Sequence, residues 1–292
     1  MEQFLQQVVN GISLGSIYAL IALGYTMVYG IIKLINFAHG DVYMIGAYIG
    51  FAAITYAKLG FFPALLISMI LCAILGVVIE RIAYKPLRNS TRIAVLITAI
   101  GVSLFLEYVM MFFVGAEVRS YPNVLSNYTL HLHGVVINMQ QIYIIVTAIA
   151  LMVLLQFIVH KTKTGKAMRA VSIDQDAAQL MGINADSTIS YTFAIGSAFA
   201  GAAGVLVGIY YNSIDPLMGI MPGLKAFVAA VFGGIGSILG AMIGGLGIGI
   251  METLVSGYGN SMYRDAFVFL FLILILILKP TGLMGKNIRE KV

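Results

Sequence analysis

The segment Phe267–Leu278 has the sequence FVFLFLILILIL, without a single polar side chain. A membrane β-strand alternates apolar and polar residues over about ten positions, and this run does not alternate. A helix needs about 20 mostly apolar residues to cross the hydrocarbon core of a bilayer. We therefore predict a transmembrane helix near residues 265–279 and reject a β-barrel.

The rest of the chain has the same apolar character. Residues of the set AVILMFWYC make up 60% of the 292 residues, and charged residues make up only 10%. A soluble domain carries about 25% charged residues, whereas a protein surrounded by lipid has an apolar outer surface. We expect one all-α polytopic membrane domain over residues 1–292, with about 8–9 transmembrane helices. The other spans are predicted near 8–32, 41–58, 61–83, 93–115, 139–160, 188–210, 223–236 and 238–256.

Basic residues predict which connections are cytoplasmic, because cytoplasmic loops of membrane proteins are enriched in Lys and Arg. The segments Arg81–Arg92 and His160–Asp186 and the C-terminal tail, with Lys286, Arg289 and Lys291, are rich in these residues. The segment 116–140 carries only Arg119 and should lie outside. The net charge of +5 therefore indicates membrane orientation rather than nucleic-acid binding.

The number of crossings predicts a break near Gly233–Ser237. An even number of spans must separate the two cytoplasmic segments on either side of residues 188–279. One continuous helix over 223–256 would give an odd number, and glycines at the break favour two shorter helices. A weak internal similarity also predicts an inverted repeat. One long helix precedes Ile35–Gly40 and another precedes Ile214–Leu217. These two helices would cross the membrane in opposite directions.

The segment 163–187 predicts a short cytoplasmic helix over residues 172–181. Ser172 or Asp174 can cap its N-terminus, and Gly182 suits its C-terminal end. Its apolar residues, Ile173, Ala177, Leu180 and Met181, follow helical spacing. Two interpretations stay open: a helix lying on the lipid surface, or a docking helix for a cytoplasmic partner.

The residues of this segment also carry a family resemblance. Residues 165–184 fit the pattern Gly-x3-Arg-Ala-x3-Asp-x3-Ala-x3-Gly-Ile-Asn, which resembles the coupling-helix segment of branched-chain amino-acid ABC transporter permeases of the LivH type. Residues 15–30, 35–43, 223–227 and 233–241 resemble the same family, so the similarity covers essentially the whole chain. The resemblance assigns coupling to the ATPase to Gly165, Arg169, Asp174, Ala178, Gly182 and Asn184.

The resemblance implies a subunit of a larger assembly in the bacterial inner membrane. The expected partners are a second homologous permease of the LivM type, two ATPase subunits and an extracytoplasmic substrate-binding protein. The chain has no Gly-x4-Gly-Lys-Ser/Thr phosphate loop. We therefore expect no enzymatic activity and no cofactor on this chain, with ATP and Mg²⁺ bound by the partner subunits. The expected substrates are branched-chain or other hydrophobic amino acids, and urea or amides stay open.

Five polar residues are candidates for the translocation path. Asn36 and His39 interrupt two apolar stretches; they either line a buried route or lie at the cytoplasmic headgroup level, which the predicted orientation favours. Glu107 and Glu252 fall inside predicted spans, where a carboxylate has a transport role or pairs with a polar neighbour. Lys225 is interpreted as an anchor near the outer interface that could also meet a substrate carboxylate.

The alternatives to this assignment are two other classes of membrane protein, and a disulfide or a metal site could add a further structural feature. An ATP-independent secondary transporter or channel for small polar solutes would rely on Glu107 and Glu252 for ion coupling. A structural membrane scaffold would not need a docking helix. Cys72 is the only cysteine, which excludes an intramolecular disulfide. His131 and His133 alone do not indicate a metal site, and none is predicted.

Overall fold

The computed structural model describes residues 1–88, 90–125, 128–132 and 134–285, and the tail residues Lys286, Arg289 and Lys291 and His133 lie outside these ranges. Helices dominate it: α1 (Glu2–Ile32), α2 (His39–Thr55), α3 (Phe61–Ile79), α4 (Arg92–Val114), α5 (Met139–Lys161), α6 (Lys163–Ile173), α7 (Gln175–Leu180), α8 (Ala185–Tyr211), α9 (Ile220–Gly233), α10 (Ile238–Tyr258) and α11 (Arg264–Leu278). The strands are β1 (Arg119–Ser120), β2 (Thr129–Leu132), β3 (Val135–Asn138) and β4 (Ser213–Ile214).

The all-α polytopic class is confirmed, but the number of spans is lower than predicted. Within the described residues, 7 helices are long and apolar enough to cross a membrane: α1, α3 with its continuation to Leu87, α4, α5, α8, α10 and the span of α11. Helix α2 has 17 residues and α9 has 14. At 1.5 Å per residue α9 reaches about 21 Å, which is less than the thickness of the hydrocarbon core.

The predicted break between two helices near residue 235 is confirmed. Helix α9 ends at Gly233 and α10 begins at Ile238. Gly234 and Gly236 have φ values of 104° and 92°, which a residue with a side chain rarely adopts. The short connection folds α10 back along α9, where the backbones meet closely at Gly233 and Gly240.

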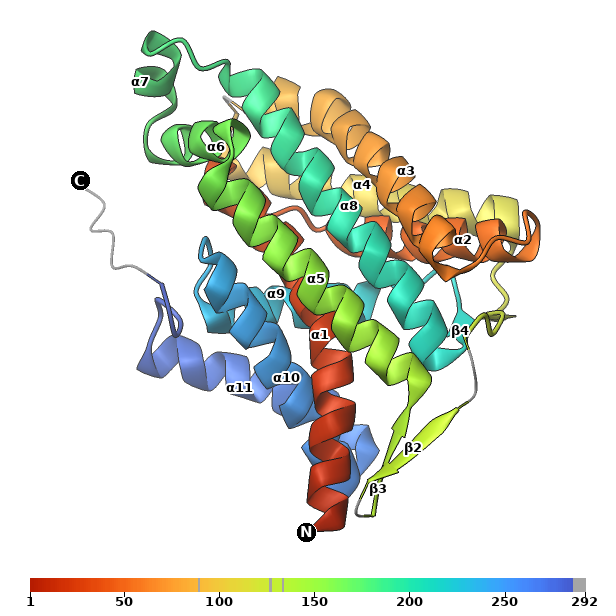
Figure 1. The fold of residues 1–292 in the computed structure, drawn as a ribbon. Coiled ribbons are helices and arrows are strands. Elements are labelled where there is room, and N and C mark those ends of the chain that lie inside the picture. Colours follow the sequence, from red (N-terminus) through yellow and green to blue (C-terminus); the bar gives the residue numbers. More distant parts are fainter. Residues whose placement is uncertain (89, 126–127, 133, 286–292) are drawn as a thin grey trace.

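Two opposite ends of the molecule are distinguished by their connections (Figure 1). The α6–α7 end holds these two helices together with the last turn of α5 and the first turn of α8. The hairpin end holds the N-terminus and the β2–β3 hairpin. At that end β1 pairs with β4, so the segment after α4 is tied to the segment after α8.

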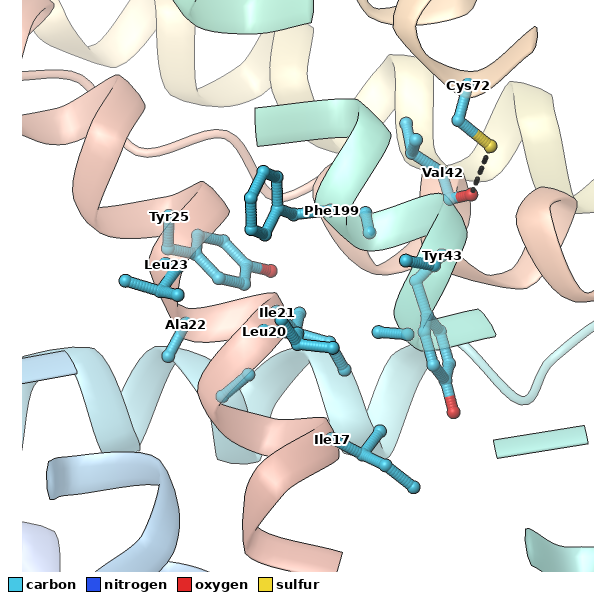
Figure 2. Close-up of a cluster of buried hydrophobic side chains, with 14 of the residues drawn as sticks. Ile17, Leu20, Ile21, Ala22, Leu23, Tyr25, Val42, Tyr43, Cys72 and Phe199 are labelled. Carbon is cyan, nitrogen blue, oxygen red and sulfur yellow. Dashed lines mark hydrogen bonds between the residues drawn. The ribbon is translucent and has the colours of Figure 1, made fainter. Parts of the chain in front are cut away.

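Helix α1 lies at the centre of the molecule and is buried along nearly its whole middle. It packs against α10 and α8, while α8 packs against α2 and α3. Glycines allow these close contacts: a Cβ added at Gly249 would lie 2.3 Å from the Cα of Gly15. Figure 2 shows side chains from α1, α2 and α8, among them Ile21, Tyr43 and Phe199, in one apolar core.

The segment after α5 forms two helices rather than the single helix predicted over 172–181. Asp174 is the point of division. Its backbone is extended (φ −153°, ψ 113°), and its Oδ1 accepts a hydrogen bond from the N–H of Ala177 at 2.9 Å. Asp174 therefore ends α6 and caps α7, whereas Ser172 donates its hydroxyl to the carbonyl of Arg169. Gly182, with φ 82°, adopts the left-handed conformation expected after a helix end.

Candidate functional site

The break between α1 and α2 folds back into the protein. The amide oxygen of Asn36 accepts a hydrogen bond from the Tyr84 hydroxyl at 2.9 Å, and both side chains are buried. The His39 ring lies against the backbone of α1 at Gly24, with the Tyr25 ring at 4.8 Å in an edge contact. Gly24 lies about 12 Å along α1 from the end of the helix. The structure thus buries the side chains of the break among helices.

The first turns of α2 and α9 meet in the same region. A Cβ added at Gly40 would lie 2.5 Å from the carbonyl oxygen of Gly219, and one added at Gly219 would lie 2.4 Å from the carbonyl oxygen of Gly40. Only glycine allows this approach in both helices. The two helix starts therefore face each other inside the protein, next to the broken end of α1.

A cavity of about 260 Å³ opens beside this crossing. Its walls come from α2, α4 and α9 and from the segment before α2. Its polar lining includes Asp41, Ser103 and Glu107, and the Ser103 hydroxyl donates a hydrogen bond to the Asp41 carboxylate. The predicted path residue Glu107 therefore faces a cavity, together with Asp41, which was not predicted.

The other two predicted path residues form a buried ion pair near the hairpin end. Lys225 Nζ lies 2.7 Å from Glu252 Oε1 and 2.6 Å from Asp265 Oδ1. The Tyr18 hydroxyl donates to Glu252 Oε2 at 2.8 Å, and Arg264 Nε lies 3.7 Å from Glu252 Oε1. We call these five residues the Glu252 cluster. The side chain of Lys225 is only 4% exposed, and carboxylates inside the protein neutralise its charge, so it is not a free basic side chain exposed to lipid headgroups.

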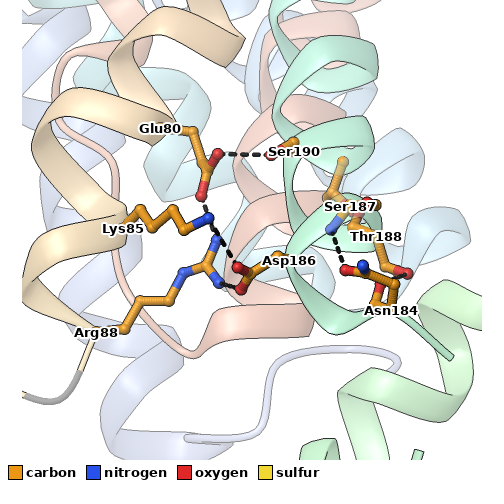
Figure 3. Close-up of polar contacts among 9 residues, drawn as sticks. Glu80, Lys85, Arg88, Asn184, Asp186, Ser187, Thr188 and Ser190 are labelled. Atoms are coloured by element: carbon orange, nitrogen blue, oxygen red, sulfur yellow. Dashed lines mark hydrogen bonds and ion pairs between the residues drawn. The ribbon is translucent and has the colours of Figure 1, made fainter. Parts of the chain in front are cut away.

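A second cluster, the Glu80 cluster, lies near the α6–α7 end (Figure 3). Glu80 is fully buried and accepts hydrogen bonds from the Ser190 hydroxyl at 2.7 Å and from the Arg88 guanidinium. Arg88 also pairs with Asp186, and Lys85 Nζ lies 2.7 Å from Asp186 Oδ2. The cluster connects the end of α3 with the beginning of α8.

The predicted coupling residues shape the connection from α5 to α8. Gly165 packs so closely on the end of α5 that an added Cβ would lie 2.2 Å from the Val159 carbonyl oxygen. Arg169 donates to the same carbonyl oxygen. Asn184 caps α8 by accepting a hydrogen bond from the N–H of Ser187 at 2.9 Å.

Ala178 is buried, whereas the neighbouring apolar side chains point outward. Ile173, Leu180 and Met181 are 86%, 90% and 83% exposed. We call these three residues the exposed apolar tip. The helix caps hold the tip in place without covering it.

Sequence reasoning missed several residues of these sites. Asp41 lies in the segment 35–43, which carries the family resemblance, but the sequence analysis did not propose it as a path residue. Its position just inside a predicted span could have indicated such a role. Glu80 could have been found in the same way, at the end of an apolar run. No local pattern points to Tyr18 or Ser103, because their partners lie far away in the sequence.

Sequence comparisons with known proteins show which family this chain is similar to. Residues 7–278 match the family described as "Branched-chain amino acid transport system / permease component". The chain is 45% identical to the high-affinity branched-chain amino acid transport system permease protein LivH of Escherichia coli K12, over 99% of this chain and 98% of that one. It is also 45% identical to BraD of Pseudomonas aeruginosa, with the same coverage, and 31% identical to a probable LivH of Methanocaldococcus jannaschii, over 87% and 81%.

One solved structure has a similar fold. It is PsaBC from Streptococcus pneumoniae in complex with Fab, with a TM-score of 0.50 and 13% sequence identity. The match covers 95% of this chain and 92% of that chain. At this identity the likeness concerns the fold alone.

Proposed function

The chain belongs to the permease family of branched-chain amino-acid ABC transport systems, and on this premise we propose how its parts carry out transport. It is the permease component of such a transporter, a multi-pass inner-membrane protein, and ATP is hydrolysed by separate ATPase subunits. No cofactor is indicated for this chain. Its family implies ATPase and binding-protein partners. This assignment replaces the ATP-independent carrier and the scaffold considered from the sequence.

We propose that residues 163–187 are the coupling region and that the exposed apolar tip docks onto an ATPase subunit. The supporting observation is that large apolar side chains are exposed on a segment whose helices are capped at Asp174 and Asn184. Large apolar side chains that are rigidly held at a surface are typical of protein interaction sites. The basic residues Lys161, Lys163, Lys166 and Arg169 precede the tip in the sequence, which favours the cytoplasmic side for this end.

We propose that Gly165, Arg169, Asp174 and Asn184 act in coupling by positioning the tip. Gly165 and Arg169 fix α6 on α5, Asp174 sets the angle between α6 and α7, and Asn184 begins α8. Ala178 and Gly182 complete the turn that returns the chain to α8. Closure of the ATPase subunits would then move α5 and α8 together, because both are attached to the same rigid segment.

An inverted repeat is the second element of the proposal. Helix α1 packs on α10 as α8 packs on α3, and the two helix starts at Gly40 and Gly219 meet reciprocally. Tyr18 and Ser190 each donate a hydroxyl hydrogen bond to a buried glutamate, near opposite ends of the molecule. These two residues are one of several pairs that lie equally far apart in the sequence.

Further pairs keep this separation. Gly24 and Gly196, whose backbones are in contact, are as many residues apart as Tyr18 and Ser190. The same holds for Glu80 and Glu252, the two glutamates that accept hydrogen bonds from these hydroxyls. The separation of 172 residues that these three pairs share supports halves α1–α3 and α8–α10 related by an axis in the membrane plane, a plan that suits alternating access.

We propose that the translocation path runs along the broken helices α2 and α9, past Asn36, His39 and Glu107. Short helices that begin inside the membrane leave polar backbone and side chains next to a cavity, which is where transporters bind their substrates. Lys225 and Glu252 hold the opposite side of α9 through their ion pair. The path would be completed by a second homologous permease of the LivM type.

The coupling proposal is tested with the double variant Leu180→Asp/Met181→Asp in the full transporter. Both side chains are exposed, so the substitutions should leave the fold intact, whereas a docking surface should lose about 2 kcal/mol or more of binding free energy. We expect ATP-driven leucine uptake and ATPase co-purification to fall by about tenfold or more. Tyr128→Asp, an exposed aromatic residue at the hairpin end, serves as the control and should behave like the wild type. Normal uptake by the double variant would disprove the coupling role of the tip.

A further inference from the structure

The cavity beside the Gly40–Gly219 crossing combines one polar corner with apolar walls. Asp41 is 2% exposed and Glu107 is 6% exposed, although both line the cavity, and their carboxyl groups interact with each other. Most of the other side chains of the lining are apolar: Phe37, Ile100, Leu104, Ile220 and Leu224. An aliphatic amino acid likewise combines a charged ammonium group with an apolar side chain.

The two carboxyl groups lack a counter-charge. Asp41 accepts a hydrogen bond from the Ser103 hydroxyl, whereas the side chain of Glu107 interacts with Asp41. No Lys, Arg or His side chain of the described chain lines the cavity. Two adjacent carboxylates at low dielectric cannot both be ionised without a cation nearby. Every other strongly buried carboxylate of the two charge clusters contacts a Lys or Arg side chain.

The place of the cavity in the fold makes a permeating cation the natural counter-charge. The cavity touches Tyr25 of α1, the first turn of α2 and the first turn of α9. These are the elements that meet at the broken helices, where a route through the fold would pass.

We propose that Asp41, Ser103 and Glu107 form a transient binding site for the α-ammonium group of the amino acid in transit, an inference that rests on the proposed function. The aliphatic side chain lies against the wall formed by Ile100, Leu104 and Leu224. The site explains how a path for hydrophobic amino acids contains two acidic residues: they select for the ammonium group rather than for the side chain. Small-molecule sites are commonly built this way, with apolar walls and a few convergent polar groups.

The first experiment measures transport by the full transporter in proteoliposomes supplied with binding protein, ATP and leucine. The double variant Asp41→Asn/Glu107→Gln should lower leucine uptake by about tenfold or more, because each charge-assisted contact to the ammonium is lost. ATP hydrolysis stimulated by the binding protein should stay within about twofold, since the exposed tip is unchanged. Glu117→Gln, the same amide replacement at an exposed carboxylate, is the matched control.

The second experiment detects the site without removing the carboxylates. Leu104→Cys introduces a thiol into the cavity wall, and the natural Cys72 is buried and gives little background. A cationic methanethiosulfonate should react about tenfold faster than an anionic one of similar size, because the carboxylates concentrate cations locally. The preference should vanish when Asp41→Asn/Glu107→Gln is added. It should be absent at Phe105→Cys, which lies on the exposed face of α4.

Leucine transport provides the final comparison. During ATP-driven uptake, leucine should slow the labelling of Leu104→Cys and leave Phe105→Cys unaffected. Equal labelling by the two reagents, or labelling that leucine does not change, would overturn the ammonium site. Uptake by the double variant at the wild-type rate would overturn it as well. Failure of the wild-type transporter to take up any aliphatic amino acid would instead disprove the proposed function, so the two failures are distinguishable.

Discussion

The Glu80 cluster and the Glu252 cluster hold corresponding positions under the proposed inverted repeat, yet they differ in their access to solvent. In the Glu252 cluster both members of the central ion pair are buried, with Lys225 4% and Glu252 2% exposed. In the Glu80 cluster the glutamate is buried, but Lys85 and Asp186 are each 49% exposed. Both clusters reach the surface through their outer members, because Arg264 and Asp265 are 44% and 34% exposed. The difference lies in the cation that contacts the glutamate, which is 4% exposed at Lys225 and 15% exposed at Arg88.

This difference suggests that the two ends of the molecule have different tasks. A buried ion pair is costly to open, because a single unpaired charge would remain at low dielectric. A half-exposed pair exchanges partners with water at little cost. The Glu252 cluster therefore suits a fixed attachment of α9 to α10 and α11. The Glu80 cluster suits a joint between α3 and α8 that adjusts when the neighbouring coupling region moves.

The largest effect is expected from Lys225→Met, which leaves Glu252 buried with its main counter-charge removed. The free energy of unfolding should fall by about 3–5 kcal/mol. The measurement is thermal unfolding of purified protein in detergent with a thiol-reactive dye. Cys72 is buried and becomes reactive only when the fold opens.

The matched control for this variant is the double variant Lys225→Met/Glu252→Gln. It removes both charges, and it should recover most of the lost stability, because the cost arises from the unpaired carboxylate. A single variant as stable as the wild type would show that Glu252 is already neutral or solvated. The closed character of this cluster would then have to be abandoned.

A smaller loss is expected from Arg88→Met in the Glu80 cluster. Glu80 is buried and loses its guanidinium partner, but it keeps the hydrogen bond from Ser190. Because Arg88 is 15% exposed, water can enter the space that its side chain leaves. We expect a decrease of about 2 kcal/mol in the free energy of unfolding, measured by the same thiol reaction. A loss equal to that of Lys225→Met would remove the distinction between the two ends.

The comparison also shows what the sequence could predict. Long apolar runs marked the helices, and the glycines at 233–236 marked the break between α9 and α10, because both signals are local. The runs at 41–58 and 223–236 were wrongly predicted as spans, because helices α2 and α9 are shorter than the other apolar helices. The family resemblance indicated the transport function through its motifs. Exposure of Leu180 and Met181 followed from the apolar stripe, although the division of the segment at Asp174 did not, because either Ser172 or Asp174 could have been the cap.

The contacts between distant helices were out of reach. Lys225 looked like an interface anchor because its partners Glu252 and Asp265 lie on other helices, and only packing brings them together. Asp41 was hidden for a related reason. An acidic residue in the first turn of a helix has an ordinary explanation in the helix dipole, so its position next to Glu107 became visible only in the fold.

An intermediate test of the comparison removes the two corresponding hydroxyls. Tyr18→Phe takes away a buried donor to Glu252, and we expect a loss of about 1.5 kcal/mol in unfolding free energy. Ser190→Ala takes away the donor to Glu80 and should cost less, since water can replace it at the more open end. Thermal unfolding of both variants side by side checks the order. The reverse order would mean that water does not replace the Ser190 hydroxyl at Glu80.

The smallest effect is expected from Asp186→Asn, which breaks only the half-exposed part of the Glu80 cluster. Arg88 keeps Glu80 as its partner, and Lys85 is free to turn toward water. The loss should stay below about 1 kcal/mol. It should disappear in 1 M salt, where charges are screened beyond about 3 Å, while the deficit of Lys225→Met should persist because salt does not reach that pair. Unfolding curves of both variants at low and high salt, with Glu117→Gln as the control for a lost surface charge, make this measurement. A large, salt-independent loss for Asp186→Asn would show that the ion pairs of the Glu80 cluster are as inaccessible to water as the Lys225–Glu252 pair. Contacts other than the Glu80 cluster would then have to transmit the motion of the coupling region.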